Sequence, residues 1–144
     1  MFHLKTDEEV ELLRQSNLLI SATLASIAHL MKPGVTTLEI DHLAEEYIRD
    51  HGGVPGFKGY QGYPATLCIS INEEVVHGIP SKRFLRDGDI VSCDCGVLMN
   101  GFNGDSTYTF TVGEVKPDVL KLIQVTKECL QLGIDQAITG NRMG

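Results

Sequence analysis

Residues 94–105, "DCGVLMNGFNGD", have an aspartate at each end and Asn100-Gly101 between them. Both central positions of a type I′ turn need a positive φ, which Asn followed by Gly tolerates well. Residues typical of strands lie on both sides, in "IVSCDCGVLM" at 90–99 and "DSTYTFTV" at 105–112. The stretch therefore predicts a tight antiparallel β-hairpin.

The two aspartates are expected on one face of this hairpin. A two-residue turn pairs Asp94 with Thr107 and Gly96 with Asp105. Side chains alternate between faces along a strand, so Asp94, Thr107 and Asp105 share a face if no bulge interrupts the register. The two carboxylates are then diagonal neighbours, at roughly 7–8 Å.

Two carboxylates on one sheet face have two interpretations. On a buried face they repel each other and are costly to desolvate, unless a cation or a proton lies between them, and a divalent metal ion meets that need. The alternative is a solvated strand end, where aspartates beside a turn have no functional role. Spacing alone leaves both interpretations open.

Composition limits the class of protein. The chain has 144 residues, of which 42% are hydrophobic and 22% charged, which is typical of a globular domain and excludes a disordered chain. No apolar run approaches the roughly 20 residues that span a bilayer, so we expect no membrane association. The net charge of −7 argues against a broad interaction with phosphate backbones, so we expect no nucleic-acid partner.

The N-terminus and the cysteines indicate the compartment. The first residues, "MFHLKTDEEVELL", lack the basic start and the apolar run of a signal peptide, so we expect a cytoplasmic protein. No two cysteines form a CxxC pair, and reduced, buried thiols are expected at Cys68, Cys93, Cys95 and Cys129.

Periodicity and capping residues predict the other elements. Helices are expected over residues 6–31, from Thr36 to just before Gly52, and over 117–138, because apolar residues recur at three- and four-residue steps. A half-buried strand is expected at 65–71 and an irregular loop at 54–64. With no repeat or linker, the sequence predicts one α+β domain over 1–144, with helices on one face of an antiparallel sheet.

Further motifs accompany the aspartates: "GYQGYP" at 59–64, "CISINEEVVHGIP" at 68–80 and "DGDIV" at 87–91. Together they resemble the methionine aminopeptidases of the bacterial type I class, and the similarity extends from residue 6 to the last residue. The resemblance implies the pita-bread fold. It also implies a two-metal hydrolase that removes the initiator methionine from new polypeptides, so that N-terminal methionyl peptides are the expected partners.

The resemblance assigns metal-binding roles to the aspartates. Asp94 would bind one divalent ion through both oxygens, and Asp105 would bridge two ions of the Co, Mn, Fe or Zn class. In the family these ions lower the pKa of a shared water and present it to the substrate carbonyl. His77 matches a histidine that contacts substrate near the scissile amide, although by composition alone it is a turn or core histidine. No other residue is assigned a catalytic role.

The resemblance also assigns a pocket for the methionine side chain. It is matched by Phe57, Tyr60, Tyr63 and Cys68, although small or sulfur-bearing residues also occur in the family where this chain has Phe57. Aromatic rings suit a polarizable thioether. Without the resemblance these residues are ordinary core. Cys93 and Cys95 flank Asp94 but point to the opposite face, where they are expected to pack and not to bind metal.

The chain departs from the family after Asp105. The family site needs a further histidine and two glutamates, but no histidine follows His77, and none of the later carboxylates matches a ligand. We therefore expect the N-terminal half of the fold, with weak or single-ion binding and little or no peptidase activity. Self-association through the exposed half-fold surface is also expected.

Two alternatives remain open at this point. One is a non-catalytic interaction module derived from the pita-bread fold. The other is a relative of the X-Pro peptidases, against which the "HGIP" motif and the compact N-terminus argue.

Overall fold

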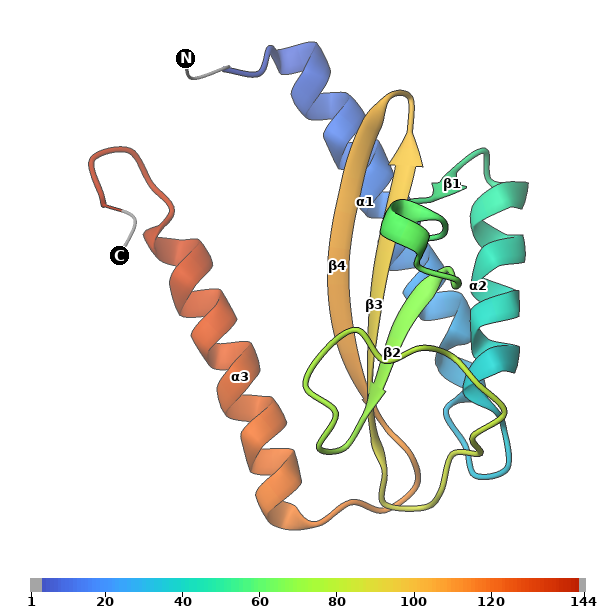
Figure 1. Ribbon diagram of the computed structural model, residues 1–144. Coiled ribbons are helices and arrows are strands. Elements are labelled where there is room, and N and C mark those ends of the chain that lie inside the picture. The colour runs from blue at the N-terminus through green and yellow to red at the C-terminus, as the bar shows by residue number, and fades with distance from the viewer. Residues whose placement is uncertain (1–3, 143–144) are drawn as a thin grey trace. The chain divides into compact units, whose positions relative to one another are not determined.

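The structure is a computed structural model that describes residues 4–142 (Figure 1). The chain divides into two compact units, the first ending at Glu114 and the second starting at Val115. The first unit contains every strand and the two helices that pack on them, and the second contains helix α3. The predicted extent of one domain, residues 1–144, stays a prediction.

The predicted hairpin is confirmed in its turn and its register. Strand β3 (Ile90–Met99) pairs with β4 (Phe102–Thr111), and the turn between them has a positive φ at Asn100 and at Gly101. No bulge interrupts the pairing, which sets Asp94 opposite Thr107 and Gly96 opposite Asp105. β4 starts earlier than predicted, because the strands pair up to the turn itself.

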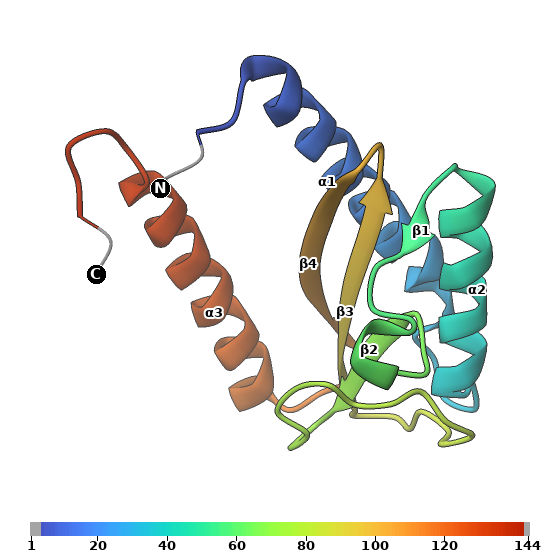
Figure 2. The same cartoon turned by 45° about the horizontal axis from the view of Figure 1, so that its top comes forward.

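Two shorter strands complete the sheet (Figure 2). β1 (Val54–Pro55) and β2 (Leu67–Ile71) pair antiparallel with different parts of β3, so β3 is the central strand. The segment predicted as an irregular loop is thus partly regular: it contains β1 and a 3₁₀ turn, η2 (Tyr60–Gly62). Pro55 is tolerated because β1 lies at an edge of the sheet.

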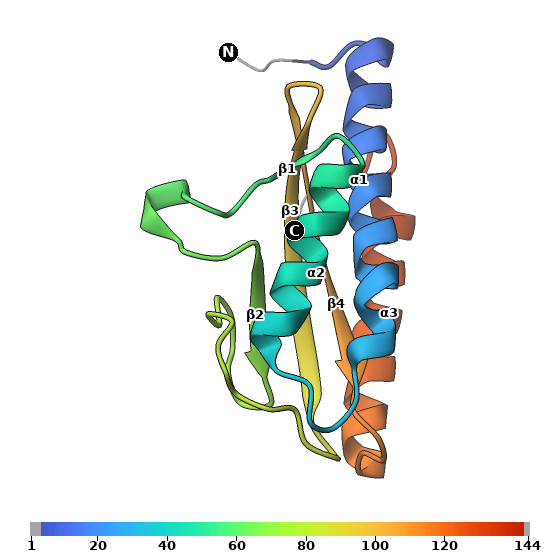
Figure 3. The same ribbon diagram turned by 90° about the vertical axis from the view of Figure 1, so that its right-hand side faces the viewer.

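Two helices cover one face of the sheet, as predicted. α1 (Asp7–Ile27) and α2 (Thr37–Asp50) each begin with a capping box, formed by Thr6 with Glu9 and by Thr36 with Glu39. A 3₁₀ turn, η1 (Ala28–Leu30), ends the first helical segment in place of the α-helix predicted there. Figure 3 shows that η2 and the loop after β2 lie on the opposite side of the sheet from α1 and α2.

The core lies between these helices and the sheet. Its β3 residues are Val91, Cys93, Cys95 and Val97, all fully buried. The two cysteines therefore pack on the helix side, opposite to Asp94, as alternation predicted. Burial raises the pKa of each of these two thiols to about 12.

Two burial predictions need correction. All four cysteines are free, but Cys129 is exposed and not buried. β2 was expected to be half-buried, yet all of its residues are buried. The reason is that Tyr63 and the backbone around Gly78 lie against the face that carries Cys68 and Ser70.

Helix α3 (Pro117–Gln136) forms most of the second unit. Pro117 lies in its first turn, where the missing N–H leaves no helical hydrogen bond unmade. None of its residues is buried, and it carries large exposed apolar side chains such as Leu122, Leu130 and Leu132. No helix within residues 4–142 has the length and apolar character required to cross a membrane.

Candidate metal and substrate site

The aspartate pair lies on the sheet face opposite to α1 and α2. Asp94 is half-buried and Asp105 is exposed. The hydroxyl of Thr107 donates a 2.8 Å hydrogen bond to Oδ1 of Asp94, as their opposed positions in the register allow. The carboxylates of Asp94 and Asp105 are close enough to interact with each other. The hairpin register therefore brings them together, as predicted.

The environment of Asp105 disfavours its negative charge. Partial desolvation, the charge of Asp94 and a hydrogen bond with that carboxylate all raise the pKa of Asp105. Two carboxylates that share a face are more stable when a proton or a cation reduces their mutual repulsion. The chemistry of this pair therefore fits a divalent cation.

A cleft of about 560 Å³ gathers the residues that the resemblance assigned to metal and substrate. Its size is in the range of pockets that hold a small ligand or one side chain. The seven assigned residues that line it are Phe57, Tyr60, Tyr63, Cys68, His77, Asp94 and Asp105. The structure thus brings all of them together, whereas their functional roles stay predictions.

One wall of the cleft depends on a close contact between Phe57 and the hairpin. A Cβ on Gly96 would lie 2.8 Å from Cδ1 of the Phe57 ring and closer still to Cε1, so the ring rests on the bare backbone of β3. Gly56 donates a 2.7 Å hydrogen bond from its N–H to the carbonyl of Gly96, which holds the loop against the strand. Gly96 is the residue opposite Asp105, so Phe57 packs next to the aspartate pair.

A second wall is built from Tyr63, Cys68 and the loop around His77. Burial, followed by interaction with Cys68, raises the pKa of Tyr63 well above its usual value. Burial is also the largest cause of the raised pKa of Cys68. His77 is exposed and has a φ of 59°, in the left-handed region that few non-glycine residues adopt. An unusual backbone conformation thus places this histidine at the cleft.

Several residues that support the site have no clear signal in the sequence. Gln61, Pro64 and Ile79 also line the cleft. Asn17 of α1 accepts a 3.4 Å hydrogen bond from the N–H of Asp105. In the sequence, Asn17 is visible only as a polar residue that interrupts the apolar stripe of the helix. The carboxylate of Asp41, on α2, accepts hydrogen bonds from the backbone of Thr66 and Leu67, just before Cys68.

A metal site cannot be completed from the described residues alone. Within residues 4–142 no group of three or more His, Cys, Asp or Glu side chains is placed to hold one ion. The residues at hand therefore supply two carboxylate ligands, whereas protein sites for transition metals generally use more.

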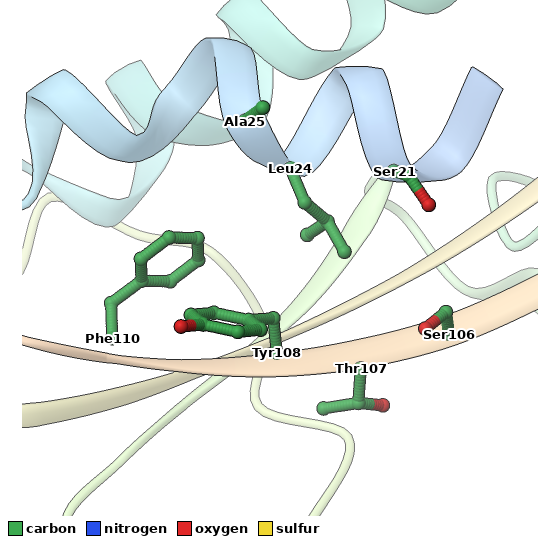
Figure 4. Close-up of a pocket in the computed structure, with 7 residues that line it drawn as sticks. All are labelled: Ser21, Leu24, Ala25, Ser106, Thr107, Tyr108 and Phe110. Carbon is green, nitrogen blue, oxygen red and sulfur yellow. The ribbon is translucent and has the colours of Figure 1, made fainter. Parts of the chain in front are cut away.

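A second hollow, of about 340 Å³, lies between α1 and β4 (Figure 4). Leu24 of α1 points toward β4, which carries Tyr108 and Phe110, and Ser21 and Ser106 lie toward one end. The rings of Tyr108 and Phe110 meet edge to face, with centroids 4.8 Å apart. The residues that line this hollow have apolar or hydroxyl-bearing side chains, and none of them is charged. The hollow therefore differs from the cleft that contains the two aspartates.

Comparison with known proteins agrees with the resemblance. The chain is 49% identical to a methionine aminopeptidase of Clostridium acetobutylicum over 144 residues, which are 99% of this chain and 58% of that protein. The crystal structure of methionine aminopeptidase from Thermotoga maritima matches 96% of this chain and 55% of that chain, with a TM-score of 0.91 and 36% identity. The pita-bread fold is therefore confirmed, and the chain spans about half the length of these relatives.

The X-Pro peptidase alternative is not favoured. The Xaa-Pro dipeptidase from Bacillus anthracis matches with a TM-score of 0.80 but only 23% identity, covering 94% of this chain and 36% of that one, which is a similarity of fold alone. The identity to the methionine aminopeptidases of Clostridium acetobutylicum and Thermotoga maritima is higher, at 49% and 36%. The model of metallopeptidase family M24 matches residues 11–144. On this match the chain belongs to metallopeptidase family M24.

Proposed function

We propose that this chain carries the first part of the metal site and the methionine pocket of a methionine aminopeptidase. The observation that supports the proposal most is the single cleft that contains Asp94, Asp105 and His77 together with the aromatic residues. Membership of a metallopeptidase family implies divalent metal cofactors. The substrates would be polypeptides with an N-terminal methionine.

The proposed roles follow from the chemistry of each side chain. Asp94, oriented by the Thr107 hydroxyl, and Asp105 would hold the divalent ions. Bound ions of this kind lower the pKa of water and polarise a carbonyl. His77, at the edge of the cleft, would donate a hydrogen bond to the scissile amide or to the oxygen that becomes negative during attack.

The pocket residues would recognise the methionine side chain. Phe57 and Tyr60 present aromatic surface to the cleft, and Cys68 adds a polarizable sulfur. A thioether packs well against both kinds of group. Recognition would therefore be apolar, with the polar contacts left to the aspartates and His77.

We further propose that these residues alone form an incomplete site. The chain spans about half the length of its relatives, and its described residues offer two carboxylate ligands. We expect weak binding of one divalent ion and little or no release of methionine from peptides.

A manganese titration followed by NMR tests the metal site. Mn²⁺ is expected to broaden the amide signals of Asp94, Asp105 and Thr107 first, at millimolar concentration. Replacing Asp105 with Asn keeps the shape and removes one charge, so the apparent affinity for Mn²⁺ should fall by roughly tenfold. Asp50→Asn, which alters an exposed carboxylate at the end of α2, is the matched control and should leave the broadening unchanged.

Two results would contradict this proposal. Broadening spread evenly over the acidic surface, and equal in both variants, would exclude a specific ion at the aspartate pair. Efficient release of methionine from a methionyl peptide in excess Mn²⁺ would show that the two carboxylates are sufficient, and would overturn the incomplete site.

We also propose that the chain self-associates, acts in the cytoplasm and does not bind nucleic acid. Self-association is supported by the apolar hollow beside β4 and by the edge of β4, which among the described residues 4–142 pairs with β3 alone. Light scattering should give a mass above 15.8 kDa that rises with protein concentration. A monomer at all concentrations would contradict self-association.

A further inference from the structure

The edge of β2 that faces away from β3 is closed by groups outside the sheet. The N–H of Leu67 donates to Oδ1 of Asp41 at 2.7 Å, and the N–H of Ile71 donates to Oε2 of Glu74 at 2.9 Å. Between them, the N–H of Ile69 donates to the carbonyl of Gly78 at 2.8 Å. The loop after β2 therefore folds back and occupies the strand position beside Ile69.

The hydroxyl of Tyr63 lies at the junction of three segments. It is 3.0 Å from the carbonyl oxygen of Leu67 and 3.0 Å from that of Gly78, and either can accept its proton. A tyrosine hydroxyl is protonated at neutral pH, and burial raises the pKa of Tyr63 further, so the group acts as a donor. It thus links the loop that carries η2, the start of β2 and the loop that carries His77.

The position of His77 depends on how Gly78 sits on β2. The N–H of Gly78 donates to Oγ of Ser70 at 3.2 Å, while its carbonyl accepts from Ile69 and faces the Tyr63 hydroxyl. A Cβ on Gly78 would overlap the carbonyl oxygen of Ile69, so the contact is backbone against backbone. His77, directly before Gly78, is itself exposed and is held in place by its neighbour.

We infer that Tyr63 is a positioning residue for His77 and not only a wall of the methionine pocket. Its hydroxyl fixes the carbonyl of Gly78 against β2, which sets where the His77 imidazole enters the cleft. The functional meaning rests on the proposed role of His77 at the substrate. The positioning itself is a property of the chain without metal or peptide.

Tyr60 offers a matched comparison. It lines the same cleft but is 67% exposed, and its hydroxyl accepts a 3.4 Å hydrogen bond from its neighbour Gln61. Tyr63→Phe and Tyr60→Phe each remove one hydroxyl group from the same cleft. Only Tyr63→Phe removes a hydrogen bond between segments far apart in sequence, the one to Gly78.

Amide hydrogen exchange and NMR of the whole chain test the inference. In Tyr63→Phe, the amides of Ile69 and Gly78 should exchange roughly five- to tenfold faster, since one hydrogen bond that holds the loop is lost. The His77 ring signals should shift or broaden in the same variant. In Tyr60→Phe, both amides should stay within about twofold of the original chain, with the His77 signals unchanged.

Two outcomes overturn the inference. One is that Tyr63→Phe leaves both amides within twofold and His77 unchanged, which would make the hydroxyl irrelevant to the loop. The other is that the amides of the central strand, such as Val91 and Cys93, accelerate by the same factor, which would reduce Tyr63 to a general contribution to stability. No metal or peptide enters these measurements, so failure of metal binding at the aspartates would be recognised separately.

Discussion

Replacement of Asp41 with alanine is expected to lower the free energy of unfolding by roughly 2–5 kcal/mol. Asp41 is 3% exposed, and its Oδ1 accepts hydrogen bonds from the N–H of Thr66 at 3.0 Å and of Leu67 at 2.7 Å. Both donors belong to fully buried residues, so alanine leaves two N–H groups without a partner and without water. Each such group costs about 1–3 kcal/mol.

Asp41→Asn is the matched control for this prediction. Its side-chain oxygen can accept the same two hydrogen bonds, so most of the stability should be retained. Burial raises the pKa of Asp41 despite the two donors, so the buried charge carries a desolvation cost that asparagine does not have. Urea unfolding followed by circular dichroism measures both variants. Equal losses of stability for Ala and Asn would show that the acceptor oxygen of residue 41 does not stabilise the fold.

Replacement of Gly78 with alanine is expected to detach the loop that carries His77 from β2, at a cost of roughly 1–3 kcal/mol. The added Cβ would overlap the carbonyl oxygen of Ile69 and lie 3.1 Å from Cα of Ser70. These are backbone atoms of the buried strand β2, so neither can move as a flexible side chain would. The amide of Ile69 should lose its protection from exchange, and the unfolding midpoint in urea should fall.

Gly133→Ala provides a control in which the same methyl group meets no obstacle. Gly133 lies inside α3, its φ is not positive, and a Cβ there would meet nothing within 4 Å. Alanine should therefore leave stability unchanged or raise it by up to about 1 kcal/mol through helix propensity. If Gly78→Ala behaved like Gly133→Ala, the close approach of the loop to β2 would not exist in solution.

The hairpin and the helix starts were predictable because local interactions specify them. Asn100-Gly101 determines the turn, and the turn determines the register, so the common face of Asp94 and Asp105 followed from the sequence. The capping boxes at Thr6 and Thr36 were equally local, since each joins residues three positions apart. The metal and pocket roles came from resemblance and not from spacing.

The supports of the cleft could not be predicted in the same way. Asp41 lies 26 positions before its partner Leu67, Tyr63 lies 15 before Gly78, and Asn17 lies 88 before Asp105. The sequence pattern shows polar or aromatic residues at these positions, but it does not identify their hydrogen-bond partners. β1 and the 3₁₀ turn η2 were missed for the same reason, because β1 exists through its pairing with Leu98 and Val97 of β3.

The hairpin, the shared face of its two aspartates and the starts of the helices follow from the amino-acid sequence, because each depends on neighbours in the chain. The packing of distant segments determines which loops close the cleft, how Tyr63 and Asp41 bond to them, and how Phe57 contacts Gly96 beside the aspartate pair. These features depend on hydrogen bonds and close approaches between segments far apart in sequence. They exist once α2, β2 and the two loops have packed on the hairpin.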